Sequence, residues 1–178
     1  MLTKVVRALL VSSAMLPALA ACGPSGPQVA SPVAKGGAVA PDFTVDLLNG
    51  ETFKLRDHKG KVVVVDFWTT FCQPCVGSLL HLQKSYAAKK DKGFVVLGVS
   101  MDPPETAGNV TPFVRSHGLT FPVAHDQQSR VTDLYNKKSS APYSVLIGRD
   151  GKIIKIRESF QPGDEVGIDA DLDAALAN

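Results

Sequence analysis

Residues 61–76 read KVVVVDFWTTFCQPCV, and this stretch decides the fold. Four valines, Asp66 and two aromatic residues form a continuous β-branched and apolar run, which is typical of a central strand buried on both faces. From Cys72 to about Lys90 the apolar residues follow helical spacing, and Pro74 lies in the first turn, where its missing N–H costs nothing. The stretch therefore predicts a buried strand that runs directly into a helix, with two cysteines at the junction.

The remaining pattern predicts an α/β domain. A small hairpin turning at Asn49-Gly50 should precede the buried strand, and a second hairpin turning at Asp150-Gly151 should follow the last crossover. We expect strands at 93–100, 120–126 and on both sides of the turn within 143–157, and helices at 102–118 (interrupted or begun late at Pro112), 127–136 and 163–177. Strands that alternate with helices indicate a central mixed β-sheet flanked by helices.

The first 41 residues are expected to lie outside the domain. Residues 1–21 combine a short basic head with an apolar stretch shorter than the roughly 20 residues of a membrane helix, and they end on small residues before Cys22. This resembles a bacterial lipoprotein signal, in which Cys22 carries the lipid. The alternative is an ordinary export signal, but a free thiol in an oxidising compartment would then be exposed. Residues 22–41, rich in Gly, Pro, Ala and Ser, predict a flexible tether, and 42–178 the folded domain.

Cleavage before Cys22 would change both charge and cysteine content. It removes Lys4 and Arg7 and no acid, so 17 of the 19 basic residues remain against 17 acidic ones. A neutral chain gives no electrostatic reason to expect binding to nucleic acid or to anionic lipid head groups. Cys72 and Cys75 would be the only free thiols. We expect a lipid-anchored monomer that faces the periplasm or the cell exterior and uses no cofactor and no metal.

The position of the cysteine pair points to redox chemistry. Cys72 precedes a helix, whose free N–H groups and dipole stabilise a thiolate and lower its pKa below the usual value near 8.5. Cys75 lies three residues further on and should be more covered. An exposed nucleophile with a covered resolving thiol suits disulfide exchange, in which Cys72 forms the mixed disulfide and Cys75 releases the product.

Asp66 ends the valine run and is expected to be buried beneath the pair. Burial disfavours its charged form and raises its pKa, so that it could exchange a proton with Cys75. The alternative is a carboxylate at a strand end that caps a loop or the following helix. Both interpretations of Asp66 remain open at this point.

These residues resemble the active-site signature of the thioredoxin superfamily, with the carboxylate, Phe-Trp and Cys-x-Pro-Cys in register. The lipoprotein signal, the hairpin leader and an extra strand–helix unit at 94–118 resemble the TlpA/ResA-type thiol–disulfide oxidoreductases, which overlap with the redoxin (AhpC/TSA) group. The resemblance implies a thioredoxin-like fold over about 40–175 and a cis-proline, matched by Pro142, which faces the pair across the substrate groove. Ala141 and Trp68 would line the same groove, an ordinary trans loop proline being the alternative for Pro142.

The chain also departs from the family pattern. Phe71 stands where Trp is common before the first cysteine, and Asp66 stands where many TlpA-type members have Asn. Gln73-Pro74 lacks the His found between the cysteines of strong oxidants. With no cation near it in sequence, Cys72 has less to depress its pKa, which favours a reductant of exported proteins, supplied by a membrane or periplasmic redox partner.

Three other functions remain open from the sequence. A redoxin-type peroxidase would carry the motif Pro-x-x-x-Thr-x-x-Cys. Thr69 fits the Thr position of this motif, but Val65 occupies the Pro position. Arg130 is a candidate for the guanidinium group of such a site. A copper-binding chaperone would combine the cysteines with His58, His81, His117 or His125, but the chain has no second Cys-x-x-Cys and no paired histidines. A purely structural disulfide would close a loop too short to restrain the unfolded chain by much.

Overall fold

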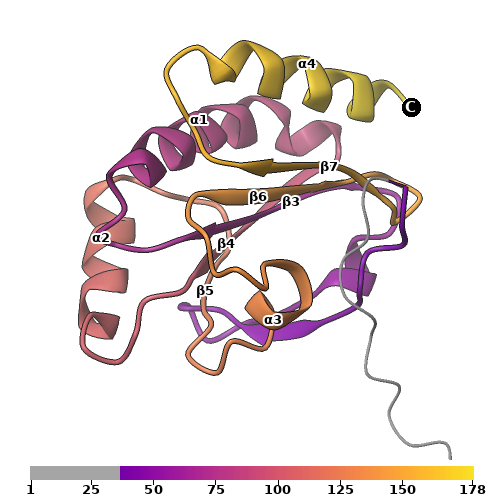
Figure 1. The fold of residues 1–178 in the computed structure, drawn as a ribbon. Coiled ribbons are helices and arrows are strands. Elements are labelled where there is room, and N and C mark those ends of the chain that lie inside the picture. The colour runs from indigo at the N-terminus through magenta and orange to yellow at the C-terminus, as the bar shows by residue number, and fades with distance from the viewer. Residues whose placement is uncertain (1–36) are drawn as a thin grey trace, which may run out of the picture.

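The computed structural model describes residues 37–178, which form a five-stranded sheet, a separate two-stranded sheet and flanking helices (Figure 1). The strands are β1 (Thr44–Asp46), β2 (Thr52–Lys54), β3 (Val62–Trp68), β4 (Phe94–Ser100), β5 (Val123–His125), β6 (Tyr143–Ile147) and β7 (Ile153–Glu158). The helices are α1 (Gln73–Lys89), α2 (Val110–Ser116), α3 (Thr132–Tyr135) and α4 (Asp164–Ala177), with single 3₁₀ turns at Leu55–His58, Lys90–Lys92 and Ala107–Asn109.

Strand β3 lies at the centre of the large sheet, whose order is β5-β4-β3-β6-β7. It pairs in parallel with β4 and antiparallel with β6, so the sheet is mixed. All seven of its residues are buried, as a β-branched strand with a neighbour on each side and a layer on each face requires. The central position of β3 fixes where its carboxyl end, and hence the cysteine pair, emerges.

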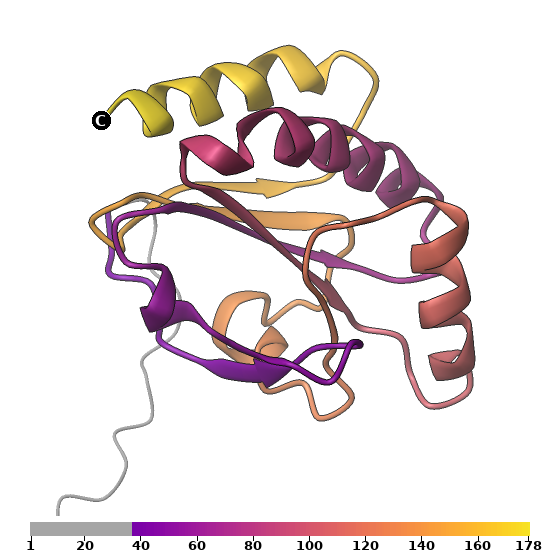
Figure 2. The same cartoon turned by 180° about the vertical axis from the view of Figure 1, so that it is seen from behind.

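The two faces of the sheet carry separate apolar clusters. On one face, Val62, Val64 and Trp68 pack against α1, α2 and α4. On the other, Val63, Val65 and Phe67 pack against the hairpin and the α3 region. Figures 1 and 2 show these layers from opposite sides, with α1 and α4 side by side over one face and the β1–β2 hairpin and α3 over the other.

The expected fold class is confirmed, with differences at element ends. The hairpin leader is β1 and β2, and the unit at 94–118 is β4 with α2. Helix α2 is shorter than the predicted 102–118 and begins at Val110, because the segment before it forms a turn at 104–106 and the 3₁₀ turn at Ala107–Asn109 instead. Helix α3 is shorter than the predicted 127–136, because the Asp126 carboxylate takes the N–H groups of residues 130–132 instead.

The predicted signal peptide at 1–21, Cys22 and most of the tether at 22–41 lie outside the described residues. Within 37–178, no helix combines the length and the apolar character that crossing a membrane demands.

Candidate active site

Cys72 is the N-cap of α1. Its backbone is extended, with φ −86° and ψ 100°, and its sulfur accepts the N–H of Cys75 at 3.3 Å. Pro74 lies in the first turn, as predicted. The sulfur therefore lies where free N–H groups and the helix dipole concentrate positive potential, which lowers the pKa of a thiol placed there.

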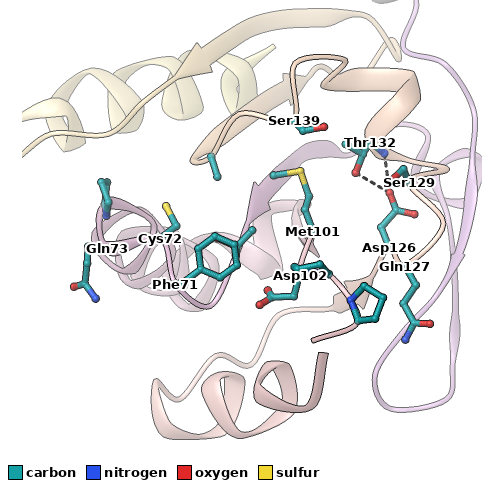
Figure 3. Close-up of a pocket in the computed structure, with 15 residues that line it drawn as sticks. Phe71, Cys72, Gln73, Met101, Asp102, Asp126, Gln127, Ser129, Thr132 and Ser139 are labelled. Carbon is teal, nitrogen blue, oxygen red and sulfur yellow. Dashed lines mark hydrogen bonds between the residues drawn. The ribbon is translucent and has the colours of Figure 1, made fainter. Parts of the chain in front are cut away.

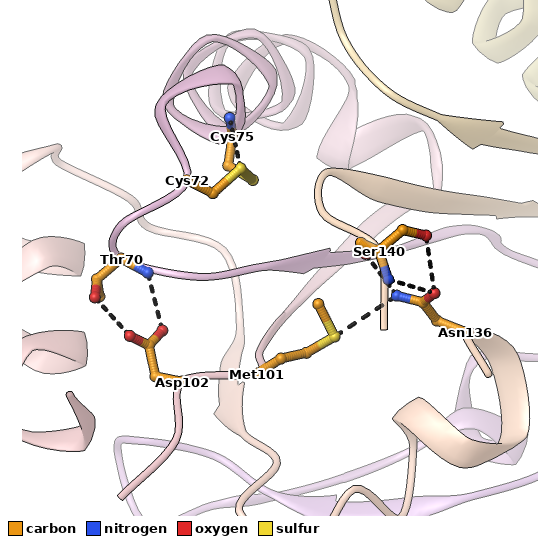
Figure 4. The surroundings of a disulfide bond; sticks show 7 residues. All are labelled: Thr70, Cys72, Cys75, Met101, Asp102, Asn136 and Ser140. Atoms are coloured by element: carbon orange, nitrogen blue, oxygen red, sulfur yellow. Dashed lines mark hydrogen bonds between the residues drawn. A yellow bond between two sulfur atoms is a disulfide. The ribbon is translucent and has the colours of Figure 1, made fainter. Parts of the chain in front are cut away.

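The two cysteines differ in exposure. They form a disulfide with their Cα atoms 5.3 Å apart (Figure 4). Cys72 is partly exposed beside the groove, whereas Cys75 is 0% exposed and packs in the cluster beneath α1. A partner can thus reach the sulfur of Cys72 but not that of Cys75. The structure has the arrangement that an attacking and a resolving thiol need.

Asp102 supports the turn that carries Cys72. Its carboxylate accepts the backbone N–H of Thr70 at 2.9 Å and also the Thr70 hydroxyl (Figure 4). It accepts the hydroxyl of Ser100 at 2.9 Å as well. The residue follows β4 and is almost fully buried. This role was not predicted from the sequence. The available signal is an acid two residues after the end of a buried strand parallel to β3, since the carboxyl ends of parallel strands meet at one edge of the sheet.

A groove of about 750 Å³ opens beside Cys72. Phe71, which is 63% exposed, lines it together with Met101 (Figure 3). Pro103 and Ala141 also line the groove. An aromatic side chain that stays exposed next to a reactive sulfur offers an apolar contact to an approaching chain. The groove can therefore hold polypeptide against the disulfide.

The three residues expected in the groove take different positions. Ala141 lines it, whereas Pro142 is buried behind it, and the Ala141–Pro142 peptide bond is cis. Trp68 has no exposed surface and stacks on Phe113 of α2, with ring centroids 4.8 Å apart. In the disulfide form only Ala141 of the three contributes to the groove, and a groove role for Trp68 and Pro142 stays a prediction.

Asp66 is fully buried on the α1 face of β3. It lies on the same face as Val64 and Trp68, its neighbours two residues away along the strand, which belong to the same apolar cluster as Cys75. Burial raises its pKa from 3.8 to about 8. The Ser78 hydroxyl opposes this shift, although it makes no hydrogen bond of standard geometry with either carboxyl oxygen. Among the described residues, neither oxygen has a hydrogen-bond partner.

The neighbouring strands explain why this carboxyl group has no charged partner. In register, Asp66 pairs with Gly98 of β4 and with Ser144 of β6, so neither strand offers a cation. A side chain at position 98 would meet the Trp68 indole nitrogen at 3.2 Å and the Phe121 ring at 3.0 Å. Desolvation is consequently uncompensated, and the protonated form is favoured.

The sequence of the chain matches the AhpC/TSA family over residues 37–156. It is also 35% identical over 124 residues to "Thiol-disulfide oxidoreductase ResA" of Halalkalibacterium halodurans, covering 70% of this chain and 69% of that protein. The chain belongs to the AhpC/TSA family.

Solved structures of thiol–disulfide exchange proteins share the fold of this chain. A putative thiol:disulfide interchange protein DsbE of Chlorobium tepidum superposes with a TM-score of 0.73 at 33% identity, covering 80% of this chain and 98% of that one. A putative protein disulfide isomerase of Bacteroides thetaiotaomicron gives 0.74 at 27% identity, covering 82% and 92%. The expected thioredoxin-like fold and the expected resemblance to ResA-type thiol–disulfide oxidoreductases are thereby confirmed.

Of the residues singled out for other functions, Thr69 lines the groove with Cys72, whereas Arg130 and the histidines do not. Arg130 is exposed and lines a different surface pocket, next to β1. None of the chain's four histidines, residues 58, 81, 117 and 125, lines the groove. Within residues 37–178, His, Cys, Asp and Glu side chains form no group of three or more that could hold a metal ion.

Proposed function

We propose that this AhpC/TSA-family protein exchanges disulfides with exported proteins through Cys72 and Cys75, outside the cytoplasm and as a monomer. The observation that carries the proposal is the asymmetry of the pair: an N-cap sulfur at the groove and a fully covered sulfur behind it. The ResA relatives, named as thiol–disulfide oxidoreductases, support the same class of reaction.

The exchange needs two attacks and one internal proton transfer. The Cys72 thiolate attacks one sulfur of a partner disulfide, forming a mixed disulfide and releasing the partner's other sulfur as a thiolate. The Asp66 carboxylate then takes the proton of Cys75, whose thiolate attacks the Cys72 sulfur. The bond between Cys72 and the partner breaks, and the second partner thiolate leaves. Two electrons have passed to the partner, and a dithiol donor must reduce the pair again.

We further propose that the pair acts as a reductant in the cell. The first turn of α1 holds no charged side chain that would add to the helix N-terminus in stabilising a Cys72 thiolate. A weakly stabilised thiolate makes the disulfide form relatively favourable, which is a property of reductants. The midpoint potential of the pair, equilibrated with glutathione, should therefore lie well below the oxidising value of about −120 mV, and a potential near that value would identify an oxidant.

Trapping with Cys75→Ser tests the exchange directly. Without the resolving thiol the mixed disulfide on Cys72 cannot be released, so partners should accumulate in the native host as complexes that a reducing agent dissolves. Mass spectrometry then identifies the trapped partners. Cys72→Ser is the matched control, because it keeps one thiol but removes the exposed one, and it should trap nothing. The absence of any complex with Cys75→Ser would rule out exchange with proteins.

We also propose that the domain is held at the membrane by a lipid on Cys22. The support is the sequence alone: small residues before Cys22, and a tether rich in Gly, Pro, Ala and Ser after it. A fatty acid bearing an alkyne should label the wild-type protein and place it in the membrane fraction, whereas Cys22→Ala should be unlabelled. Equal labelling of both proteins would disprove the anchor.

A further inference from the structure

A small, partly open cavity lies between β3, β6, β7, α1 and α4, and Asp66 itself is not part of its wall. The cavity has a volume of about 30 Å³. This exceeds the roughly 10–15 Å³ that one water molecule needs, and water also requires polar partners in the wall. The two serines nearest Asp66, Ser78 and Ser144, supply hydroxyl groups to that wall.

The cavity extends away from the cysteines. Ser144 stands opposite Asp66 in the β3–β6 register, on the same face, because its neighbour Val145 belongs to the cluster on the other face. Val64, two residues before Asp66 along β3, also lines the cavity. Ser78 lies about one turn of α1 beyond Cys75. The cysteine pair and the cavity therefore lie on opposite sides of Asp66.

The outer end of the cavity reaches charged side chains near solvent. Arg157 of β7 and Asp171 of α4 line it, form an ion pair and have side chains 28% and 32% exposed. Lys155 also lies 3.8 Å from the Asp171 carboxylate. Polar groups thus run from the serines beside Asp66 to an ion pair at the surface, through a wall that is otherwise apolar.

We propose that Ser78, Ser144 and the cavity between them and the Arg157–Asp171 pair form a proton route that connects Asp66 with solvent. The inference rests on the proposed function, in which Asp66 takes the proton of Cys75. Each hydroxyl or water in the route accepts one proton as it passes one on, so only Asp66 and the solvent change their protonation.

The chemistry of exchange creates the need for such a route. Asp66 has no exposed surface, and its pKa is raised to about 8, so most of the carboxyl groups carry a proton at neutral pH. That proton must reach solvent before the group can accept another from Cys75. The opposite side of Asp66 is closed by the cluster containing Cys75, and a bound partner fills the groove beyond it.

The groups that face Asp66 identify the cavity as the polar path from this carboxyl group to solvent. From β4 it meets Gly98, from β6 Ser144, and from α1 Cys75 and Ser78. None of these carries a fixed charge. The nearest charged side chains in the cavity wall are those of its outer end.

The test compares Ser144→Val with Ser144→Thr in the full-length, reduced protein. The two replacements have nearly the same volume and both suit a strand, but only threonine keeps the hydroxyl. The probe is dithionitrobenzoate, which releases one coloured anion when Cys72 attacks and a second when Cys75 closes the disulfide. Rapid mixing in light and heavy water, on both sides of the Asp66 pKa, resolves the two releases.

We expect Ser144→Val to slow the second release about tenfold, part of the roughly 100- to 10,000-fold that a positioned proton acceptor contributes. It should also enlarge the solvent isotope effect on that release, while the first release and the Ser144→Thr protein behave as wild type. Ser78→Ala should slow the second release as well. Ser85→Ala is the matched control, because Ser85 is a buried serine of the same helix that bonds to Asp169 instead.

Equal second-release rates and isotope effects for the valine and threonine variants would overturn the route. If Asp66→Asn still slows that release, the proposed function survives and only the route is lost. If Asp66→Asn has no effect, Asp66 takes no proton from Cys75 and the route fails with it. A wild-type protein that releases no second anion would contradict the proposed function itself.

Discussion

The carboxyl group of Asp66 is buried without a hydrogen-bond partner or a counter-ion among the described residues, and this one constraint links the fold to the chemistry. Burying an uncompensated charge costs several kcal/mol, so the carboxyl group stays protonated and neutral instead. Its position follows from the sheet: β3 is central, β4 offers only Gly98 beside it, and α1 closes over it. The same face of the sheet carries the apolar cluster that contains Cys75, and a weak buried acid on this face suits the exchange that we propose.

The two cysteines lie in different environments, and each environment suits a different step of the exchange that we propose. Cys72 lies at the N-terminus of α1, where free N–H groups favour a thiolate, and Asp102 ties the turn that carries it to the end of β4. Cys75 is already inside the helix and is shielded from solvent. In the exchange that we propose, Cys75 therefore depends on a nearby base, for which Asp66 is the candidate. Attack and resolution would then take place on separate sulfurs.

Local patterns in the sequence were enough to predict the strand and the helix that meet at the cysteine pair. The valine run predicted β3 as a strand buried on both faces, and the position of Pro74 predicted where α1 starts. The burial of Asp66 followed from its place at the end of that run. These features depend on neighbouring residues, which a single sequence displays directly.

The features that sequence reasoning missed depend on contacts between distant segments. Asp102 is 32 residues from its partner Thr70, and Ser144 meets Asp66 only because β6 pairs with β3. The walls of the cavity come from five elements. Helix α3 came out shorter than predicted because the carboxylate of Asp126 competes for its first N–H groups. Strand order and side-chain capping of this kind cannot be read from spacing.

The most direct test of the central claim is the free energy of unfolding as a function of pH, for wild type and Asp66→Asn. Because burial raises the Asp66 pKa from 3.8 to about 8, the folded protein binds more protons than the unfolded chain between these values. The stability from this group is complete below the unfolded pKa and is lost as the pH rises through the folded one. Relative to Asp66→Asn, the wild type should thus lose several kcal/mol between about pH 4 and pH 8. Asp91→Asn, at an exposed site, should keep the wild-type slope. Parallel curves for wild type and Asp66→Asn would contradict the account.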